Sequence, residues 1–416
     1  DVIAPGGDID ILARDVQITE ARETSRSQSQ QSFSQSGVTL AIKAPLINTL
    51  QSIEDTTRAM GDTTDDRMRA LGAASVALSG YSAYQDIAQA AAGVDFSGNV
   101  SMGASLSIGS SRSESPSTGS SNIAAGSRVQ AGGNVSITAT DGGRESNIHV
   151  RGSEISAGNN VNLSADNDIT LEAARNTQSQ TSTSRSSNSS VGVSYSFGSQ
   201  NGFTFDAAFG SSRGSDNGTD TGWTSTSISA GNQVNIASGG SATLRGATVS
   251  GYRVNADVGG NLNIQTLQDT SLYHSQSSGS GLSVSICAWL CYGESSASVY
   301  AHNMRGEGDY ASATEQSGIR AGDGGFNVNV RGNTDLVGGV ISSTQTALDR
   351  DRNSFSTGSL TMSDVQNHDV FQGSGYSVSL STSTSGNSAG VGSSDINQSS
   401  TTRSGITGIA GNTEVR

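Results

Sequence analysis

The chain is poor in the residues that build metal sites and cofactor pockets. Its 416 residues include two cysteines, four histidines and three prolines, and aromatic residues make up 5%. The histidines, His149, His274, His302 and His368, are far apart in the sequence and lack the spacing of metal ligands. We therefore expect no cofactor and no metal, and we expect surface or corner positions for the histidines.

Basic residues and long apolar runs are also scarce. The chain has 23 Lys and Arg against 37 Asp and Glu, a net charge of −14 and no basic cluster, which argues against a nucleic-acid ligand. No stretch reaches the roughly 18 apolar residues of a transmembrane helix. The chain begins without a methionine or a signal peptide, so we interpret residues 1–416 as a single fragment of a longer protein.

What the chain does contain is a pattern of short alternating runs. Residues 131–175 hold four runs with apolar side chains at every second position, each ended by Gly, Asn or Asp: Val135/Ile137, Ile148/Val150, Val161/Leu163 and Ile169/Leu171. This pattern predicts short strands separated by turns. None of the runs can bury a face alone, so each needs a similar segment to stack on.

Similar segments follow at a regular spacing. The segment beginning at Val150 aligns with those beginning at Leu244 and Leu336, and their matching glycines, Gly152, Gly246 and Gly338, lie 94 and 92 residues apart. A period of about 93 residues, seen in about four units, predicts a solenoid with these glycines at its corners.

Hairpins interrupt the repeats at the same period. In residues 191–209 two alternating runs flank the dipeptide Asn201-Gly202, a strong hairpin signal. A third hairpin is predicted near 282–301, and a fourth, weaker one near 376–392. In the hairpin at 191–209 large side chains fall on one face, and we expect that face to lie against the flank of the solenoid, because a lone two-stranded hairpin is marginally stable in water.

The first hairpin carries the helical signal of the chain. After a Ser/Gln-rich bridge, Val38–Ile42 is an alternating strand whose expected partner is Val100–Ile108. Between them, residues 45–92 place apolar residues at three- to five-residue steps in an Ala-rich stretch, which predicts a pair of helices inserted at the hairpin tip. The pair either packs its apolar face on itself or engages lipid or a partner.

These observations predict an all-β fold: a right-handed parallel β-helix with protruding antiparallel hairpins and one helical insertion. Coils stacked about 4.8 Å apart would pair every strand with those above and below, and the expected crossover is right-handed. The ends of such a stack are open strand edges, so flanking repeats of the same protein are expected to cap them.

The motifs at the coil corners carry a family resemblance. Ala157-Gly-Asn, Ala230-Gly-Asn and Gly259-Gly-Asn each open an alternating run, and Ile169–Arg175 closes one before a Ser-rich hairpin. In these features the chain resembles the haemagglutinin-repeat exoproteins of bacterial two-partner secretion. These include filamentous haemagglutinin adhesins and the effectors of contact-dependent growth inhibition. The regular hairpins resemble the second repeat region of those proteins.

The resemblance implies a secreted, cell-surface segment that is held in the periplasm before export. Its implied partners are the outer-membrane transporter of the secreting cell and the target cell's outer membrane or its proteins. The implied function is non-catalytic help in passing a C-terminal toxin across that membrane. The alternative is a rigid adhesin shaft, and both hypotheses predict the same rod.

The two cysteines stand at a predicted hairpin tip. In one extended strand Cys287 and Cys291 would lie about 13 Å apart, too far for a disulfide. A bond therefore requires a turn at residues 288–290, and the alternative is two unpaired thiols. Trp289 and Leu290 between them either contact a membrane or partner or fold back onto the solenoid.

Candidate catalytic and calcium-binding residues show no convergent pattern. Some parallel β-helices degrade polysaccharides with acids gathered on one face. The corresponding rows here carry Glu172, Arg175, Gln265 and Ser363, without paired acids at recurrent positions, so we expect no enzyme. The acidic residues Asp166 and Asp168 and the loop 322–325 favour corner turns over calcium, because no Gly-Gly-x-Gly-x-Asp repeat is present.

Overall fold

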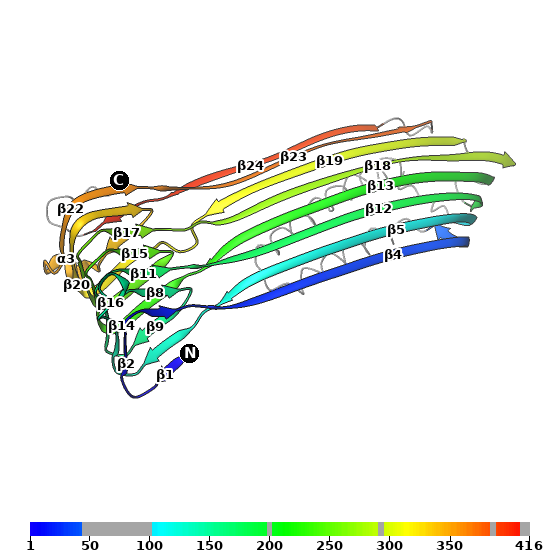
Figure 1. The fold of residues 1–416 in the computed structure, drawn as a ribbon. Coiled ribbons are helices and arrows are strands. Elements are labelled where there is room, and N and C mark those ends of the chain that lie inside the picture. Colours follow the sequence, from blue (N-terminus) through cyan, green and yellow to red (C-terminus); the bar gives the residue numbers. More distant parts are fainter. Residues whose placement is uncertain (44–101, 198–201, 290–294, 383–387, 408–416) are drawn as a thin grey trace.

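The computed structural model describes residues 1–43, 102–197, 202–289, 295–382 and 388–407. Their strands form two sheets, one of 17 strands paired in parallel and one of 8 strands paired antiparallel. Figure 1 shows the first sheet wound into a solenoid and the second extending away from it. The prediction of an all-β parallel β-helix is confirmed.

The solenoid has three faces, on which strands of successive coils stack in register. The first face contains β1 (Val2–Ala4), β6 (Arg128–Ala131), β9 (Glu154–Ala157), β21 (Val340–Ser342), β25 (Gly405–Ile406) and the first parts of β14 (Thr226–Ser238), β16 (Ala247–Val258) and β20 (Gly318–Val337). The second contains β2 (Ile9–Ala13), β7 (Val135–Ala139), β10 (Asn160–Ala165), later parts of β14, β16 and β20, and the start of β22 (Ser354–Ser363). The third contains β3 (Val16–Ile18), β8 (Ile148–Arg151), β11 (Ile169–Glu172), β15 (Ala242–Arg245), β17 (Leu262–Gln265) and the ends of β20 and β22.

Apolar columns run through the inside of the solenoid. The first face contributes residues that are register partners from coil to coil and at most 3% exposed: Val129, Ile155, Ile228, Val249, Ile319 and Ile341. Each buried aliphatic side chain contributes roughly 1.5–3 kcal/mol relative to an exposed one. Because each column passes from coil to coil, the core belongs to neighbouring coils jointly, and one coil cannot form it alone.

The Ala-Gly-Asn motif makes the corner between the first and second faces. A Cβ on Gly158 would overlap the carbonyl oxygen of Gly132 in the preceding coil, so the close approach requires glycine. Beside it, Asn160 Nδ2 donates a hydrogen bond to Asn134 Oδ1 at 2.9 Å. The Gly-Gly-Asn motif at 259–261 lies instead between the second and third faces.

The corner after the third face determines whether the chain continues the solenoid or leaves it. Seven residues occupy this corner in successive coils: Glu20, Gly152, Ala173, Gly246, Thr266, Gly338 and Asp364. The three glycines have φ of +54°, +64° and +60°, and after each the chain turns into the next coil. After the other four residues it leaves as a hairpin strand, so two coils separate successive hairpins.

The hairpins form the eight-stranded sheet. In spatial order its strands are β4 (Ala21–Lys43), β5 (Met102–Ala125), β12 (Ala174–Phe197), β13 (Gly202–Thr224), β18 (Asp269–Trp289), β19 (Ser296–Ser312), β23 (Val365–Ser381) and β24 (Ser388–Thr402). At about 3.3 Å per residue the longest strands span roughly 75 Å. Figure 1 shows them side by side, with β4 and β24 at opposite edges.

Three expectations about the hairpins need correction. Their apolar faces do not lie against the solenoid, because each hairpin pairs edge to edge with the next one and points away. Their strands extend well beyond the predicted ranges 191–209, 282–301 and 376–392. The Ser/Gln-rich bridge is part of β4, which pairs with β5 from Ala21↔Ala125 to Lys43↔Gly103.

Helices are few in the described part of the chain. They are the 3-10 helix η1 (Gly143–Glu145) and the α-helix α3 (Gln345–Asp349), whose N-cap Thr344 accepts a hydrogen bond from the Ala347 N–H. Among the described residues, neither is of a length and hydropathy that would cross a bilayer. The predicted helical insertion at 45–92 lies outside the described residues.

Candidate interaction surface

The eight-stranded sheet is held together by pairing within and between hairpins. Within one hairpin, β12 pairs with β13 from Ala174↔Thr224 to Ser196↔Gly202. Between hairpins, β12 pairs with β5 from Thr177↔Asn122 to Phe197↔Met102. Backbone donors and acceptors that would be unpaired at the edge of a lone hairpin are thus paired by its neighbour, which explains why the hairpins do not need the solenoid as a partner.

A repeated side-chain bond joins neighbouring hairpins at their roots, where the backbone pairing between them ends. The third residue after each of three exit corners accepts a hydrogen bond from a backbone N–H at the root of the preceding hairpin: Asn176 from Ala124 (2.7 Å), Asp269 from Trp223 (3.1 Å) and Asn367 from Ala313 (3.0 Å). Asp269 and Asn367 are 7% and 8% exposed. We call these three the root residues.

The root residues were not identified from the sequence. They are single polar residues in Ser-, Thr- and Asn-rich stretches, without apolar periodicity. Their common position, three residues after Ala173, Thr266 and Asp364, is the signal that finds them once the exit corners are known.

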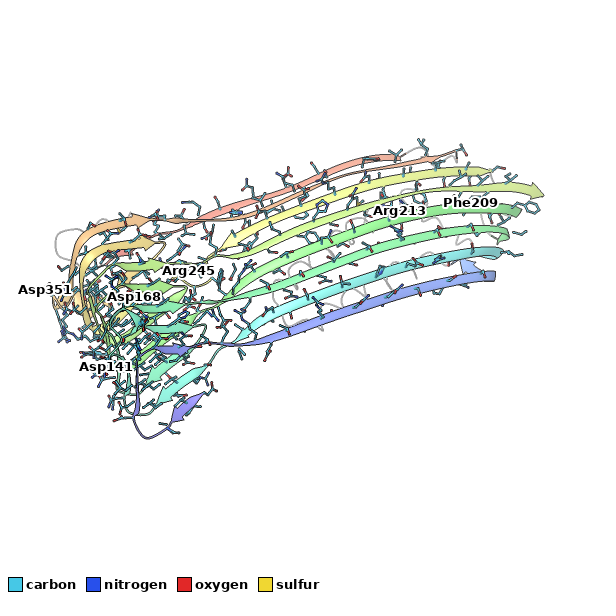
Figure 2. The ribbon with its side chains drawn as sticks, in the orientation of Figure 1. Asp141, Asp168, Phe209, Arg213, Arg245 and Asp351 are labelled. Carbon is cyan, nitrogen blue, oxygen red and sulfur yellow. The ribbon has the colours of Figure 1, made fainter. Side chains whose placement is uncertain are left out.

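The outer part of the sheet carries an exposed apolar band on one face. Its members are joined by direct cross-strand pairing or by alternation along a strand: Ile108, Val191, Val193, Phe205, Phe209, Leu282, Ile286, Val299, Val378 and Leu380. Each is between 37% and 66% exposed. Figure 2 shows Phe209 in the outer part of β13, farther from the solenoid than Arg213. We call these ten residues the apolar band.

The face opposite the apolar band is mainly polar, with aromatic rings lying over glycines. The hydroxyls of Ser283 and Ser298 hydrogen-bond across strands at 2.6 Å. Tyr300 lies opposite Gly281, where its ring fills the space that a Cβ on Gly281 would take. Such rings cover the backbone that glycine leaves exposed, and they help to stabilise the sheet.

Nearer the solenoid both faces are mainly polar, although Ile123 and Leu272 are 45% and 57% exposed there. Cross-strand serine pairs recur, for example Ser120 with Ser179 at 2.8 Å and Ser186 with Ser212 at 2.7 Å. We call this part of the sheet the polar shank. Hydrogen-bonding side chains on both faces suit a single layer that is wetted on both sides.

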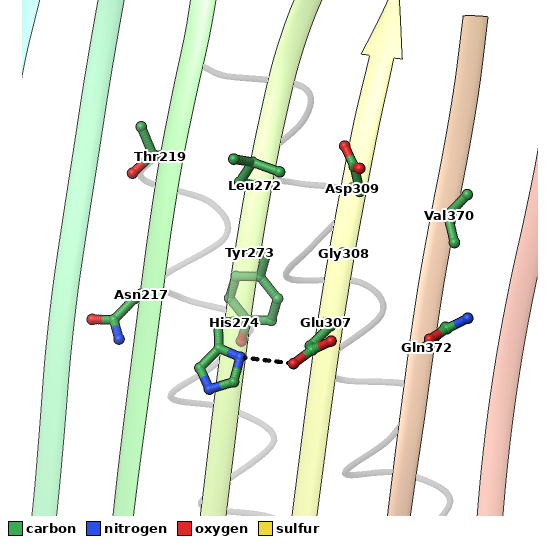
Figure 3. A pocket seen from close by; sticks show the side chains of 10 residues that line it. All are labelled: Asn217, Thr219, Leu272, Tyr273, His274, Glu307, Gly308, Asp309, Val370 and Gln372. Carbon is green, nitrogen blue, oxygen red and sulfur yellow. Dashed lines mark ion pairs between the residues drawn. The ribbon is translucent and has the colours of Figure 1, made fainter.

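An open hollow of about 470 Å³ lies on the polar shank across β13, β18, β19 and β23. Figure 3 shows its lining, in which His274 Nδ1 lies 3.5 Å from Glu307 Oε1. These side chains are 40% and 49% exposed, so solvent screens the pair. Among the described residues no three His, Cys, Asp or Glu side chains are grouped to hold a metal ion.

The other histidines lie apart from one another. His149 Nε2 pairs with Glu172 Oε1 at 2.9 Å on the outside of the third face. His368 Nε2 lies 3.2 Å from Asp309 Oδ1 in the sheet, and the ring of His302 covers Gly279.

The residues weighed for catalysis do not converge. Glu172, Gln265 and Ser363 occupy the same outward column of the third face but in different coils. Arg175 belongs to β12, where its Nη2 donates to Thr221 Oγ1 at 3.3 Å. A hydrolase of this fold needs two acids close to one substrate, and Glu172 is the single acid among these four residues.

The residues weighed for calcium serve as corner acceptors. Asp166 Oδ2 accepts from the Asp141 N–H at 3.0 Å, and Asp168 Oδ1 accepts from the Ser241 N–H at 2.7 Å. In the loop 322–325, Asp323 Oδ1 accepts from the Thr344 hydroxyl at 2.6 Å.

The predicted tip residues are only partly described. Cys287 lies in β18 and is disulfide-bonded. Cys291 and Leu290 lie outside the described residues, so the Cys287–Cys291 pair stays a prediction. Trp289 is the last residue of β18 and is paired with Phe203, so the strand continues through positions 288 and 289, where a turn was expected.

Known proteins match the chain along most of its length. Residues 106–282 match the family described as Hemagglutinin repeat. Deoxyribonuclease CdiA of Dickeya dadantii (strain 3937) is 34% identical over 392 residues, which are 92% of this chain and 11% of that protein. Toxin CdiA of Escherichia coli is 34% identical over 423 residues, 100% of this chain and 13% of that protein.

A shorter relative shows the same likeness. Deoxyribonuclease CdiA of Yersinia pseudotuberculosis serotype O:3 (strain YPIII) is 36% identical over 393 residues, 92% of this chain and 35% of that protein. The chain thus spans between 11% and 35% of these curated relatives. No solved structure matches the chain.

Stacked coils, glycine corners and regularly spaced hairpins define a haemagglutinin-repeat segment. With the matches above, the chain belongs to the haemagglutinin-repeat exoproteins of two-partner secretion and contact-dependent growth inhibition.

Proposed function

We propose that this segment is a non-catalytic structural part of a contact-dependent growth inhibition exoprotein. It aids delivery of a C-terminal toxin across the outer membrane of the target cell. The observation that carries the proposal is the apolar band, held tens of ångströms from the solenoid at the end of the polar shank. A large exposed apolar surface is typical of a site that contacts another protein or a membrane.

The division of the sheet into polar shank and apolar band supports a role at a distance from the rod. Between its two ends the solenoid buries its apolar columns in its own core. The polar shank carries serine and threonine on both faces and is suited to water. The apolar band is therefore the part of the described sheet that is best suited to leave water, and it would contact the target cell's outer membrane or its proteins.

The names of the relatives do not make this segment a nuclease. Deoxyribonuclease CdiA of Dickeya dadantii and tRNA nuclease CdiA of Escherichia coli (strain NC101) each share only 11% of their length with this chain. The outward residues of the coils pair singly across coils, as His149 does with Glu172. We assign the segment no catalysis.

The setting follows from the family. We propose that the segment is exported through an outer-membrane transporter of the secreting cell, is held in the periplasm before export, and acts at the cell surface. The runner-up function is the rigid shaft of an adhesin. It is supported by the continuous apolar columns, which make the solenoid a stiff rod independently of the function of the eight-stranded sheet.

The experiment replaces band residues in the full-length parent protein. The variant Phe205→Ser, Phe209→Ser, Leu282→Ser, Ile286→Ser removes four large side chains from one face. The matched control, Phe33→Ser with Ile396→Ser, removes two exposed side chains, 56% and 47% accessible, from the opposite face. Surface display, attachment to target cells and growth inhibition are measured for both.

Delivery predicts normal display and attachment with at least tenfold weaker inhibition for the band variant alone. Weakened attachment with inhibition per attached cell unchanged favours the shaft instead. Equal inhibition by both variants and the parent would show that the apolar band has no part in delivery.

A further inference from the structure

The solenoid and the sheet advance by the same distance in every unit. Two coils raise the solenoid by about 9.6 Å, since stacked strands lie about 4.8 Å apart. One hairpin adds two strands, and therefore the same 9.6 Å, to the width of the sheet. Because a hairpin leaves after every second coil, both structures lengthen together without strain.

The edge of the sheet at β24 shows no sign of protection against further pairing. Edge strands are commonly blocked by proline, lysine or a bulge. β24 contains neither proline nor lysine, and it pairs with β23 from Val365↔Thr402 to Ser379↔Ser388 without a register shift. Its residues 392–400 are all exposed. β4, at the other edge, also lacks proline and pairs with β5 without a register shift, and its one lysine, Lys43, is its last residue.

The end of the solenoid beside β24 is uncovered as well. Met362 is the register partner of Leu336 in the apolar column of the third face. Leu336 is 0% exposed, whereas Met362 is 51% exposed, since no described strand of this face stacks on β22. The uncovered column and the unpaired edge lie on the same side of the molecule (Figure 1).

We infer that β24 and β4 are docking edges for the hairpins of neighbouring two-coil units of the same protein. One continuous antiparallel sheet then runs alongside one continuous solenoid. The inference does not depend on a role in toxin delivery. Its occupant is a further repeat and not a second molecule, because only a unit covalently joined to the solenoid covers Met362 and reaches β24 at the correct height.

The root residues specify the chemistry of the occupant. Three of the four described hairpins have an Asn or Asp as the third residue after the exit corner, and it accepts a backbone N–H of the preceding hairpin. The hairpin that docks on β24 should therefore carry Asn or Asp at that position, preceded by a corner residue other than glycine.

The experiment extends the full chain by one unit of its own sequence. A copy of residues 320–406 is placed after Ile406 in place of residues 407–416, since Ile406 occupies the same column as Ile319. Hydrogen exchange of the β24 peptides, residues 388–402, is then compared between the original and the extended chain. The outward-facing half of these amides should exchange roughly 10- to 100-fold more slowly in the extended chain.

Two control extensions separate the sheet from the solenoid. The first repeats residues 320–364 joined to 404–406, with the copied Asp364 replaced by glycine so that the coil continues, which adds two coils without a hairpin. The second repeats residues 320–337 joined to 364–406, which adds a hairpin after one coil and so places it about 4.8 Å from the required height. Both should leave β24 exchanging as in the original chain, while far-ultraviolet circular dichroism checks that each extension has folded.

Three results would overturn the inference. In the first, the complete extension folds but leaves β24 exchange unchanged. In the second, the coil-only extension protects β24 equally. In the third, the original chain already shows protection of β24 that rises with protein concentration, because then a second molecule occupies the edge.

Discussion

At the corner after the third face, the residue type determines whether the chain continues the solenoid or leaves it as a hairpin strand. Where the corner after the third face is Gly152, Gly246 or Gly338, the backbone adopts a left-handed turn and the coil continues. Left-handed backbone costs a residue with a Cβ roughly 1–2 kcal/mol. Residues such as Ala173 and Thr266 instead continue extended into a hairpin strand.

Gly246→Ala should therefore destabilise the chain by about 2–4 kcal/mol. The new Cβ would be strained at φ +64° and would also lie 2.5 Å from Ala173 Cβ and 2.8 Å from Leu267 Cδ1. Gly143→Ala is the control, because Gly143 has φ +55° with no atom within 4 Å of its Cβ position. Urea unfolding should show a loss of about 1 kcal/mol there; equal losses at both sites would contradict a role for the close packing.

Glu20 occupies the same corner in the first described coil and ties the first hairpin to the next coil. Its side chain is 0% exposed; Oε2 accepts from Arg151 Nε at 2.8 Å, and Oε1 lies 2.6 Å from Arg22 Nη2 without hydrogen-bond alignment. Burial opposes ionisation, but the hydrogen bond from Arg151 and the charges of both arginines outweigh it. The pKa of Glu20 is therefore lowered.

A lowered pKa in the folded state makes Glu20 stabilising at neutral pH. This contribution is complete above the ordinary carboxyl pKa and is lost as the pH falls through the lowered one. Glu20→Gln should thus be less stable than the parent at pH 7 and lose less stability between about pH 5 and pH 3. Urea midpoints across this range test it, with Glu145→Gln as control, since Glu145 is 73% exposed. If the urea midpoints of Glu20→Gln and the parent fell equally between pH 5 and pH 3, the stabilising role of ionised Glu20 would be refuted.

At the scale of the element, the hairpins were only partly predictable. Alternation of large and small residues in 191–209 predicted a one-sided apolar face, and the apolar band contains residues of that stretch. The strands of the polar shank were not predicted, because serine and threonine occupy both faces and the sequence there shows no alternation of apolar and polar residues. The position of the apolar face, away from the solenoid, was not predicted either. It depends on pairing between hairpins some 90 residues apart, which local sequence does not encode.

The root residues belong to this scale because each joins two hairpins. Asn367→Ala would leave the Ala313 N–H without its acceptor and remove the bonds from Asn367 Nδ2 to Ser400 and Thr402. An unpaired buried donor costs about 1–3 kcal/mol. Unfolding in urea should show this loss, whereas Asn397→Ala, at an exposed position of β24, should be neutral. Unchanged exchange of the Ala313 amide in the variant would argue against the bond.

At the scale of the molecule, the solenoid was predictable because its core repeats. Val135/Ile137 and Val161/Leu163 carry the same inward pattern in successive coils, and the repeat of the aligned glycines shows the period. The equal advance of the two sheets was not predictable, since it follows from the number of coils between hairpins and not from any single motif.

Because the solenoid and the eight-stranded sheet lengthen by the same distance in every unit, the number of residues deleted does not predict how much a deletion disturbs the fold. Removing residues 153–246 takes out 94 residues but preserves two coils between the remaining hairpins, so β5 can pair with β18. Removing residues 152–172 takes out one coil and brings two hairpins to overlapping heights. The larger deletion should keep a cooperative thermal transition and the smaller one should not; the reverse order would show that the coils and the sheet are independent.

The exit corners also order events in time. Each hairpin after the first pairs with the outer strand of the preceding hairpin, and each coil stacks on the coil before it. A polypeptide threaded outward from its N-terminus would therefore lock behind the exit channel step by step, as a ratchet does, and backward slipping would require unzipping a completed ribbon.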